Sequence, residues 1–362
     1  MAGFEGIRWA SRQMRYTLVD KQFSLTAGDD KVFAVSRSIH YGAFLAFEGI
    51  RFFCRKTADG RPEVVFLNWD KNWERFRRGI SFNLGRSQQA LVPEAEELEN
   101  VFIRLFFADP AMKAFLLEMA DLGAQGYLRP FTVDEEQSIG VTYPAQPSIR
   151  AVAARYDRYL GEPFCGVVVP GLVRALGTNG TGCLKLGVNY LISVKAIDEA
   201  RRISPDAASA LFLDDQTAVP LDDRNITEWD TSCCLFALRD GTVVKIPESN
   251  LILPSVTIQG MVVLLRNLGV KVEERHMSYG ELRRRAASGE LVTVCSIGTA
   301  GILNRCSKLV LLDEKGNVDS THNPDEKHPL YAQLGKVREQ YWDIYKGKFQ
   351  PPAGLKLFKY AL

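Results

Sequence analysis

The interpretation of this chain begins with the stretch Gly180-Thr181-Gly182-Cys183-Leu184-Lys185-Leu186-Gly187-Val188-Asn189-Tyr190. Closely spaced glycines allow a backbone to turn tightly around a small, flat ligand. The single lysine, Lys185, stands just before an amphipathic helical pattern that begins at Tyr190. A lysine amine that is held among turns and shielded from water can form a Schiff base with a carbonyl compound. Glycine turns with one lysine are also common in plain loops, so the assignment depends on the rest of the chain.

The composition is typical of a soluble globular protein. The 362 residues favour two domains, and the net charge of +2 provides no basic field for nucleic acid. No uncharged run approaches the ~18 residues of a membrane-spanning helix, and residues 1–20 contain no apolar segment typical of a signal peptide. We therefore expect a cytoplasmic protein without nucleic-acid or membrane partners.

The cysteines and histidines argue against several kinds of site. The seven cysteines are odd in number, scattered and never spaced as CxxC, which favours reduced core thiols over a disulfide framework or a zinc site. The four histidines lie apart from any serine or cysteine motif, so no nucleophilic triad is predicted. We expect no metal.

Hydrophobic periodicity predicts a mixed α+β chain. Three-four spacing of apolar residues over 94–122 indicates two helices broken near Pro110, and the same spacing over 190–201 indicates another helix. Ser255 is a good N-cap for a helix over 256–268. Residues 1–30 show no regular pattern. Strands are predicted over 31–35, 63–67, 148–154, 207–213, 226–238 and 291–295, and a final helix near 331–346.

These elements divide into two predicted domains. We expect a smaller α+β domain over 1–153, an interdomain linker over 154–165, and a larger, β-rich, cofactor-binding domain with flanking helices over 166–362. Both are long enough to bury a core of their own.

Four elements of the second half could converge on one ligand. Lys185 offers an amine, and Glu228 offers a carboxylate where one strand ends and another begins. The helix that starts at Val256 offers unpaired N–H groups, which suit a phosphate, and Gly298-Thr299-Ala300 offers more. Pyridoxal phosphate (PLP) requires such a set, because a carboxylate keeps its ring nitrogen protonated and the ring then takes up carbanion electrons. Taken singly, Glu228 could be a solvated turn residue, and the helix start could be capped by its own side chain.

Six motifs in a fixed order support the convergence. They are His40-Tyr41-Gly42 with Phe47-Glu48-Gly49, Tyr127-Leu128-Arg129-Pro130, Lys185-Leu186-Gly187-Val188-Asn189-Tyr190, Thr227-Glu228, Leu253-Pro254-Ser255-Val256-Thr257, and Gly298-Thr299-Ala300. In order and spacing they resemble the branched-chain aminotransferases, which are class IV (fold type IV) PLP-dependent enzymes. The resemblance extends from about residue 38 to about residue 305 and implies a two-domain fold type IV enzyme.

The resemblance also implies individual roles. Lys185 would be the catalytic Schiff-base lysine and proton carrier, Glu228 would pair with the pyridine nitrogen, and Tyr190 with the phenolic oxygen. The phosphate would be held by Val256, Thr257 and Thr299. The substrate side would be lined by Tyr41, Phe47, Tyr127, Arg129 and Ala300. Arg174 stands one residue further from the lysine than a family arginine does, and it could equally be a solvated loop residue.

The chain departs from the family around the expected site. Asn68 stands where the family has a phosphate-binding arginine, and the loss of that charge-assisted contact would weaken cofactor binding by a few kcal/mol. Val188, Ser255 and Ile258 replace glycine, glycine and arginine. Cys233-Cys234 replaces an asparagine in a run that is one residue longer. This clustering predicts altered chemistry or an altered substrate.

The leading hypothesis is PLP-dependent transamination between an amino acid with an apolar, branched-chain-like side chain and a 2-oxo acid, by a homodimer as the resemblance implies. Two alternatives remain open. The same lysine and cofactor could serve a lyase, decarboxylase or other specialised biosynthetic reaction. The chain could also be a cofactor-free, non-catalytic or repurposed member of the family.

Overall fold

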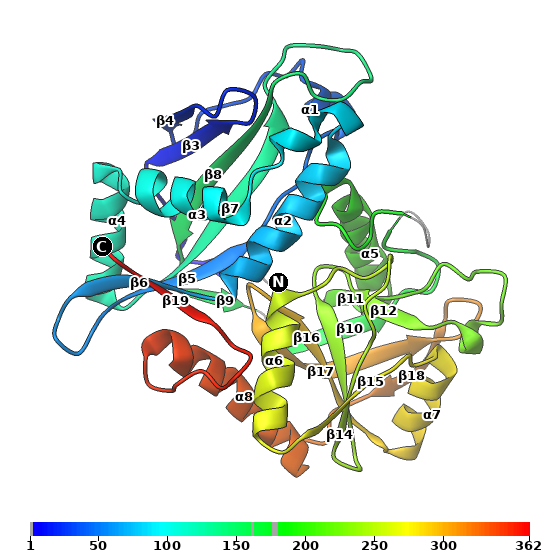
Figure 1. Ribbon diagram of the computed structural model, residues 1–362. Coiled ribbons are helices and arrows are strands. Elements are labelled where there is room, and N and C mark those ends of the chain that lie inside the picture. The colour runs from blue at the N-terminus through cyan, green and yellow to red at the C-terminus, as the bar shows by residue number, and fades with distance from the viewer. Residues whose placement is uncertain (1–2, 161–162, 176–179) are drawn as a thin grey trace.

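The computed structural model describes residues 3–160, 163–175 and 180–362. Two large β-sheets, each with its own helices, form the molecule, and they lie at the upper left and lower right of Figure 1. The mixed α+β class predicted from the sequence is confirmed. None of the described helices combines the length and the apolar character that crossing a membrane requires.

The first sheet is antiparallel, in the order β19-β6-β5-β7-β8-β3-β4, with β2 added against β8. Its strands are β2 (Arg8–Trp9), β3 (Arg12–Thr17), β4 (Phe23–Ala27), β5 (Ile50–Lys56), β6 (Pro62–Leu67), β7 (Gln125–Asp134), β8 (Pro147–Arg155) and β19 (Leu357–Ala361). Residues 1–30 therefore contain regular strands that the sequence pattern did not indicate. The predicted strand over 31–35 is wrong, because this largely exposed segment has no neighbouring strand and strand propensity depends on such pairing.

Helices flank the first sheet. They are α1 (Arg37–Tyr41), α2 (Trp69–Asn83), α3 (Ala95–Asn100), which runs on as a π-helix to Phe106, and α4 (Pro110–Leu122). Aromatic residues of α2 and of the π-helix are buried against the sheet. The predicted break near Pro110 is confirmed, with Asp109 capping α4. Aromatic side chains in the core join β6 to α2 and α2 to the π-helix. The ring centroids of Phe66 and Trp69 are 4.1 Å apart, and those of Trp73 and Phe102 are 4.8 Å apart.

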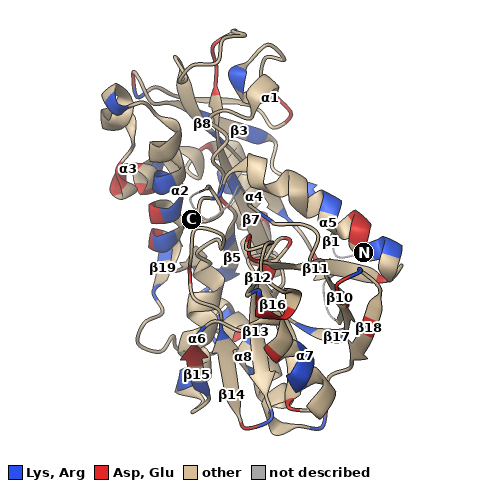
Figure 2. Cartoon of the chain, turned by 90° about the vertical axis from the view of Figure 1, so that its right-hand side faces the viewer, with Lys and Arg blue, Asp and Glu red and all other residues tan. Residues whose placement is uncertain are grey.

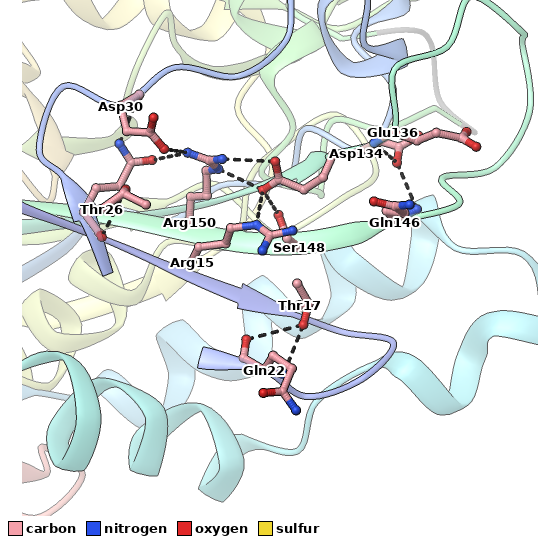
Figure 3. A network of polar contacts seen from close by, with 12 residues as sticks. Arg15, Thr17, Gln22, Thr26, Asp30, Asp134, Glu136, Gln146, Ser148 and Arg150 are labelled. Carbon is pink, nitrogen blue, oxygen red and sulfur yellow. Dashed lines mark hydrogen bonds and ion pairs between the residues drawn. The ribbon is translucent and has the colours of Figure 1, made fainter. Parts of the chain in front are cut away.

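A buried ionic network closes one end of this sheet (Figure 3). Arg150 of β8 donates to both oxygens of Glu135, at 2.9 and 3.0 Å, and to Asp30 at 2.8 Å. Arg15 and Ser148 donate to the same Glu135 carboxylate. Burial alone would raise the pKa of Glu135, but Arg150 outweighs it and the pKa is lowered. The network therefore joins the first hairpin to β8 and the loop after β7.

The second sheet is mixed, in the order β12-β11-β10-β17-β16-β13-β14-β15, with β18 against β17. Strand β10 runs parallel to β11 and β17, and β14 runs parallel to β15. The strands are β10 (Phe164–Val168), β11 (Ala207–Leu213), β12 (Ile226–Trp229), β13 (Cys233–Leu238), β14 (Thr242–Lys245), β15 (Lys271–Glu274), β16 (Leu291–Gly298), β17 (Ile302–Leu312) and β18 (Val318–His322). The strand character predicted over 226–238, with one strand ending and another beginning near Glu228, corresponds to β12 and β13.

Four helices flank the second sheet: α5 (Tyr190–Ile203), α6 (Val256–Asn267), α7 (Tyr279–Ser288) and α8 (Pro329–Lys346). The predicted cap is confirmed, since the Ser255 hydroxyl accepts the N–H of Ile258 at 3.3 Å. The predicted final helix is confirmed by α8. Figure 2 shows basic and acidic residues interleaved along α5 and α7.

The two sheets are connected twice by the chain. Strand β9 (Arg158–Leu160), which pairs with β1 (Gly3–Glu5), leads from the first sheet toward the second. After α8 the chain returns, and β19 pairs with β6 in the first sheet. The sequence pattern did not indicate that the C-terminal strand pairs within the first sheet. The division of the chain into two domains at a linker over 154–165 stays a prediction.

Candidate active site

A cavity of about 680 Å³ is lined by residues of both sheets. Leu45 to Phe47 and alternate residues of β7 line one side, and the opposite side comes from the turn before α5 and the ends of β16 and β17. The cavity brings together the expected residues Phe47, Tyr127, Arg129, Lys185, Tyr190, Thr299 and Ala300. Segments separated by up to 259 positions in the chain, from Leu45 to Asn304, therefore meet around one space.

The loop that carries Lys185 is fixed by its own backbone and by Asn189. The Asn189 amide donates to the carbonyls of Thr181 and Leu184, and its Oδ1 accepts from the Thr181 hydroxyl at 2.7 Å. A Cβ at Gly182 would lie 2.4 Å from the carbonyl oxygen of Asn250, so that close approach requires glycine. The loop therefore presents Lys185 from a defined position.

Lys185 faces two aromatic rings. Its Nζ donates to the Tyr190 hydroxyl at 3.0 Å and lies 4.9 Å from the centre of the Phe47 ring. The Lys185 carbonyl accepts the N–H of Phe47 at 3.0 Å, which connects the loop to the first-sheet side. Burial raises the pKa of Tyr190, but the charges of Lys185 and Arg174 outweigh it, and the pKa is lowered. The Lys185 amine and the Tyr190 hydroxyl therefore share a hydrogen bond. The lowered pKa of Tyr190 means that its hydroxyl loses its proton more easily than an ordinary tyrosine.

Glu228 lies behind this pair at the end of β12 and is 2% exposed. Its carboxylate is 2.7 Å from the Arg174 guanidinium, and it accepts the N–H of Leu253 at 3.0 Å. The Cys233 thiol lies 3.7 Å from its second oxygen. Burial raises the pKa of Glu228 to about 7, although Arg174 and the Leu253 N–H act in the opposite direction.

Arg174 is buried and is no solvated loop residue. Its guanidinium lies 5.6 Å from the centre of the Tyr190 ring and donates to the carbonyl of Gly182 at 3.3 Å. Glu228, Arg174, Tyr190 and Lys185 therefore form one continuous set of polar contacts. The sequence offered one signal for Arg174, its place upstream of the lysine, but not its partner.

A narrow cleft beside the main cavity contains the expected phosphate residues Val256, Thr257 and Thr299. Arg51 of β5 also lines it. The Arg51 guanidinium donates to the carbonyls of Thr299, at 3.0 Å, and Ala300, at 2.5 Å, and so fixes that turn. The sequence analysis missed this arginine, because nothing in its local pattern indicates contact with residues 299–300.

Asn68 is directed away from this cleft. It takes a left-handed conformation (φ 53°) at the start of α2, and its Oδ1 accepts the N–H of Lys356 at 2.8 Å. The residue that lines the cleft is its neighbour Leu67. The side chain facing the expected phosphate position is thus a leucine, one residue from the expected one.

Tyr41 is also outside the cavity lining. It lies on α1, is 48% exposed, and donates its hydroxyl to the carbonyl of Ile139 at 2.8 Å.

A second buried pair, Glu48 and Arg75, lies on the first-sheet side. Arg75 donates to both oxygens of Glu48, at 2.8 and 2.5 Å, and to the carbonyl of Pro254 at 2.7 Å. Burial would raise the pKa of Glu48, but Arg75 outweighs it and the pKa is lowered. Since Pro254 directly precedes the Ser255 cap, this pair connects the first sheet to the start of α6. Sequence reasoning missed Arg75.

Within the described residues, no group of three or more histidine, cysteine, aspartate and glutamate side chains could hold a metal ion. The cavity lining offers the Lys185 amine and the Tyr190 phenol, and the Glu228 carboxylate is buried behind them.

Comparison with known proteins identifies relatives along most of the chain. No family model matches it. It is 26% identical over 333 residues to a probable branched-chain-amino-acid aminotransferase of Staphylococcus aureus, covering 88% of this chain and 80% of that protein. It is 28% identical over 324 residues to branched-chain-amino-acid transaminase 1 of Bacillus subtilis, covering 85% and 83%.

Solved structures show the same fold. The branched-chain aminotransferase of Thermoproteus uzoniensis with norvaline superposes with a TM-score of 0.66 at 20% identity, covering 96% of this chain and 99% of that one. The PLP form of the Thermobaculum terrenum enzyme gives 0.65 at 16% identity, covering 96% and 98%. In sequence this chain is thus similar to branched-chain aminotransferases, and its fold is that of the fold type IV enzymes.

Proposed function

We propose that this protein is a PLP-dependent aminotransferase that exchanges the amino group of an amino acid with a 2-oxo acid. The observation that carries the proposal is the contact between the Lys185 amine and the Tyr190 hydroxyl, backed by the buried Arg174–Glu228 pair. Relatives named as branched-chain aminotransferases support it. The apolar side of the cavity, with Leu45, Phe47 and Phe131, suits an apolar, branched-chain-like side chain.

The donor set fits PLP. Lys185 would hold the aldehyde carbon, Tyr190 would hydrogen-bond the phenolic oxygen, and Glu228 would pair with the ring nitrogen. The N–H groups of Val256 and Thr257, with Thr299, would bind the phosphate. When bound, PLP supplies an electron sink for a carbanion at the substrate α-carbon.

The chain's own residues would then position the substrate and move one proton. Lys185 Nζ would take the proton from the substrate α-carbon and return it on the cofactor side. The N–H groups of the Thr299-Ala300 turn, held by Arg51, would meet the α-carboxylate. Arg129, 2.9 Å from the Tyr127 hydroxyl and 4.8 Å from the Phe47 ring centre, adds a cation on the substrate side.

The proposal includes a cytoplasmic homodimer in which domains 1–153 and 166–362, joined by 154–165, enclose the cavity, without nucleic-acid or membrane partners. Exposed apolar side chains support self-association: Leu191 and Val194 of α5 are 75% and 71% exposed, and Val188 beside them is 42% exposed. Light scattering of the purified protein would test this, and a monomer at micromolar concentration would contradict it.

The decisive experiment is the visible spectrum of the purified protein with and without added PLP. A band trapped by borohydride on Lys185, absent in Lys185→Ala, is the expected result. Assay with 2-oxoglutarate and a panel of amino acids should then yield glutamate. A bound cofactor with no glutamate formed from any donor would favour a lyase or decarboxylase instead.

One observation favours the cofactor-free alternative. Leu67 faces the cleft where a cation would meet the phosphate, and Arg51 is already engaged with two carbonyls. A colourless protein that takes up no PLP at millimolar concentration would support that reading and overturn the proposed function.

A further inference from the structure

The narrow cleft at the start of α6 also contains polar side chains from two other helices. Asn72 of α2 and the tyrosines Tyr341 and Tyr345 of α8 line it, beside the first turn of α6. Thr299 lines both this cleft and the main cavity, so the two spaces adjoin at that residue. A phosphate carried by a ring in the main cavity would therefore come within reach of these three side chains.

Asn72 has a side-chain amide without a protein partner. The residue lies one helical turn after Asn68, on the buried face of α2, and is 5% exposed. None of the described residues forms a hydrogen bond with its amide, and the amide atoms are not sealed off from solvent. Polar groups that are nearly buried and unpaired are uncommon in folded proteins. Because Asn72 lines the cleft, its NH₂ group can donate to a ligand there.

The hydroxyls of Tyr341 and Tyr345 are placed by the packing of α8 on α6. A Cβ at position 260 would lie 3.1 Å from the Tyr341 ring, so this ring packs closely against Gly260. The Tyr341 side chain also interacts with Thr257 at the start of α6. Tyr345 follows one turn later, with the two ring centroids 5.7 Å apart. Burial raises the pKa of both hydroxyls, so they stay protonated at neutral pH and can donate hydrogen bonds.

Charge is scarce in this cleft. Among the described residues that line it, Arg51 alone is charged, and its guanidinium already donates to the carbonyls of Thr299 and Ala300. Leu67 contributes an apolar side chain. A phosphate in the cleft would therefore depend on the N–H groups at the start of α6 and on neutral side-chain donors.

We propose that Asn72, Tyr341 and Tyr345 bind the phosphate of the cofactor, so that neutral donors from α2 and α8 replace a cationic one. This inference rests on the proposed function and deepens it, because it assigns three further residues to the cofactor. A hydrogen bond to a charged group changes affinity by about 10- to 100-fold. The affinity for the phosphate-bearing cofactor should therefore fall by this much when the Asn72 amide is removed.

The first test compares PLP with pyridoxal, which has the same ring and aldehyde but lacks the phosphate. Their dissociation constants are measured on the protein freed of cofactor, from the absorbance of the Lys185 adduct and without any turnover. Asn72→Leu should weaken PLP binding by about 10- to 100-fold and leave pyridoxal binding unchanged. A residue that serves only the fold would weaken the binding of both compounds alike.

A second substitution keeps the test decisive if the leucine variant fails to fold. Asn72→Asp has nearly the same shape, but it replaces the donor with a negative charge beside the phosphate. It should weaken PLP binding more than Asn72→Leu does, because like charges repel, and pyridoxal binding should again stay unchanged.

The tyrosines are tested by removing one hydroxyl at a time. Tyr341→Phe and Tyr345→Phe keep the ring packing, and each should weaken PLP binding by about tenfold without changing pyridoxal binding. The matched controls are Asn267→Leu, at the exposed end of α6, and Tyr331→Phe, elsewhere on α8. In both controls the two dissociation constants should equal those of the wild type.

The outcomes distinguish this inference from the proposed function. If the Asn72 and tyrosine variants keep the wild-type preference for PLP over pyridoxal, or if the controls lose it equally, the inference is overturned even where glutamate is formed. If the preference falls as expected but no amino acid yields glutamate, the inference stands and transamination does not. Failure of the wild type to take up PLP overturns both.

Discussion

Two arginine–glutamate pairs are buried beside the cavity, and their carboxylates have opposite properties. Glu48, on the first-sheet side, has a lowered pKa, whereas Glu228, on the second-sheet side, has a pKa raised to about 7. Their exposure is nearly the same, at 0% and 2%. Burial alone therefore cannot explain the difference.

The number of donors explains it. Glu48 receives two hydrogen bonds from Arg75 and one from the N–H of Gly49 at 2.8 Å. Glu228 has an ion pair with Arg174, whose Nε has no hydrogen-bond partner, and one backbone N–H. A fully compensated pair serves to hold structure together, whereas an under-compensated carboxylate can pair with a protonated group of a ligand.

The largest expected effect concerns the first pair. Glu48→Gln leaves the Arg75 charge buried without a counter-ion, and the free energy of unfolding should fall by about 3–5 kcal/mol. Urea denaturation would measure it. Glu228→Gln should cost much less, because its pair is poorly compensated to begin with. Equal losses in both variants would end the distinction between the two pairs.

Catalytic activity should depend more strongly on the second pair, that of Glu228 and Arg174. Glu228→Gln removes the proposed partner of the ring nitrogen, and kcat for transamination should fall by about 100- to 1000-fold, the effect typical of losing one electrostatic contact in a site. Asp230→Asn is the matched control, since Asp230 is a buried acid with a pKa raised to about 6 by burial but bonds Ser209 and not the site. A similar loss in the control would contradict the assignment.

The pH dependence of stability tests the direction in which the pKa values of Glu228 and Glu48 are shifted. Because Glu228 titrates near pH 7 in the folded protein and near 4.5 when unfolded, the folded state binds more protons between these values. Its contribution to the free energy of unfolding should therefore decline by roughly 3 kcal/mol as pH rises from 4.5 to 7. Glu48 acts oppositely, and its contribution is lost as pH falls below 4.5.

Urea midpoints of cofactor-free wild type and Glu228→Gln at pH 5 and pH 7.5 would measure this. The difference between the two proteins isolates Glu228 from Asp230, whose pKa is also raised. A constant difference across this range would show that Glu228 does not titrate there.

The sequence indicated those parts of the fold and site that depend on local pattern. The Lys185 loop, the Ser255 cap and the break before α4 are such features, since each is encoded within a few residues. The partners of the two glutamates were not indicated, because Arg75 reaches Glu48 across 27 positions and Arg174 reaches Glu228 across 54. Contacts of this range depend on how the sheets assemble.

Register explains the remaining differences. Alternation along β6 and the left-handed start of α2 place Leu67, and not Asn68, at the cleft, and a shift of one residue is below what spacing can resolve. Strand β19 is half-buried or exposed along its length, and it pairs with β6, which lies about 300 positions earlier in the chain. Its short sequence alone therefore did not indicate a strand.

The smallest expected effect is a lowering of the pKa of Glu228, in the direction of the lowered pKa of Glu48. Burial raises the pKa of the Cys233 thiol, which therefore stays protonated and is a weak donor 3.7 Å from the carboxylate. A hydroxyl in its place donates more strongly, so Cys233→Ser should stabilise the ionised carboxylate by about 0.5–1 kcal/mol and lower the pKa of Glu228. The fall in stability with rising pH should accordingly become shallower.

Cys234→Ser is the control, because that thiol contacts the carbonyl of Thr227 and not the carboxylate. Both variants would be compared with wild type by the same urea midpoints at pH 5 and pH 7.5. If the two serine variants change the pH dependence alike, the thiol beside Glu228 does not set its charge. If only Cys233→Ser changes the pH dependence, a single stronger hydrogen-bond donor is enough to lower the pKa of Glu228 toward the lowered pKa of Glu48.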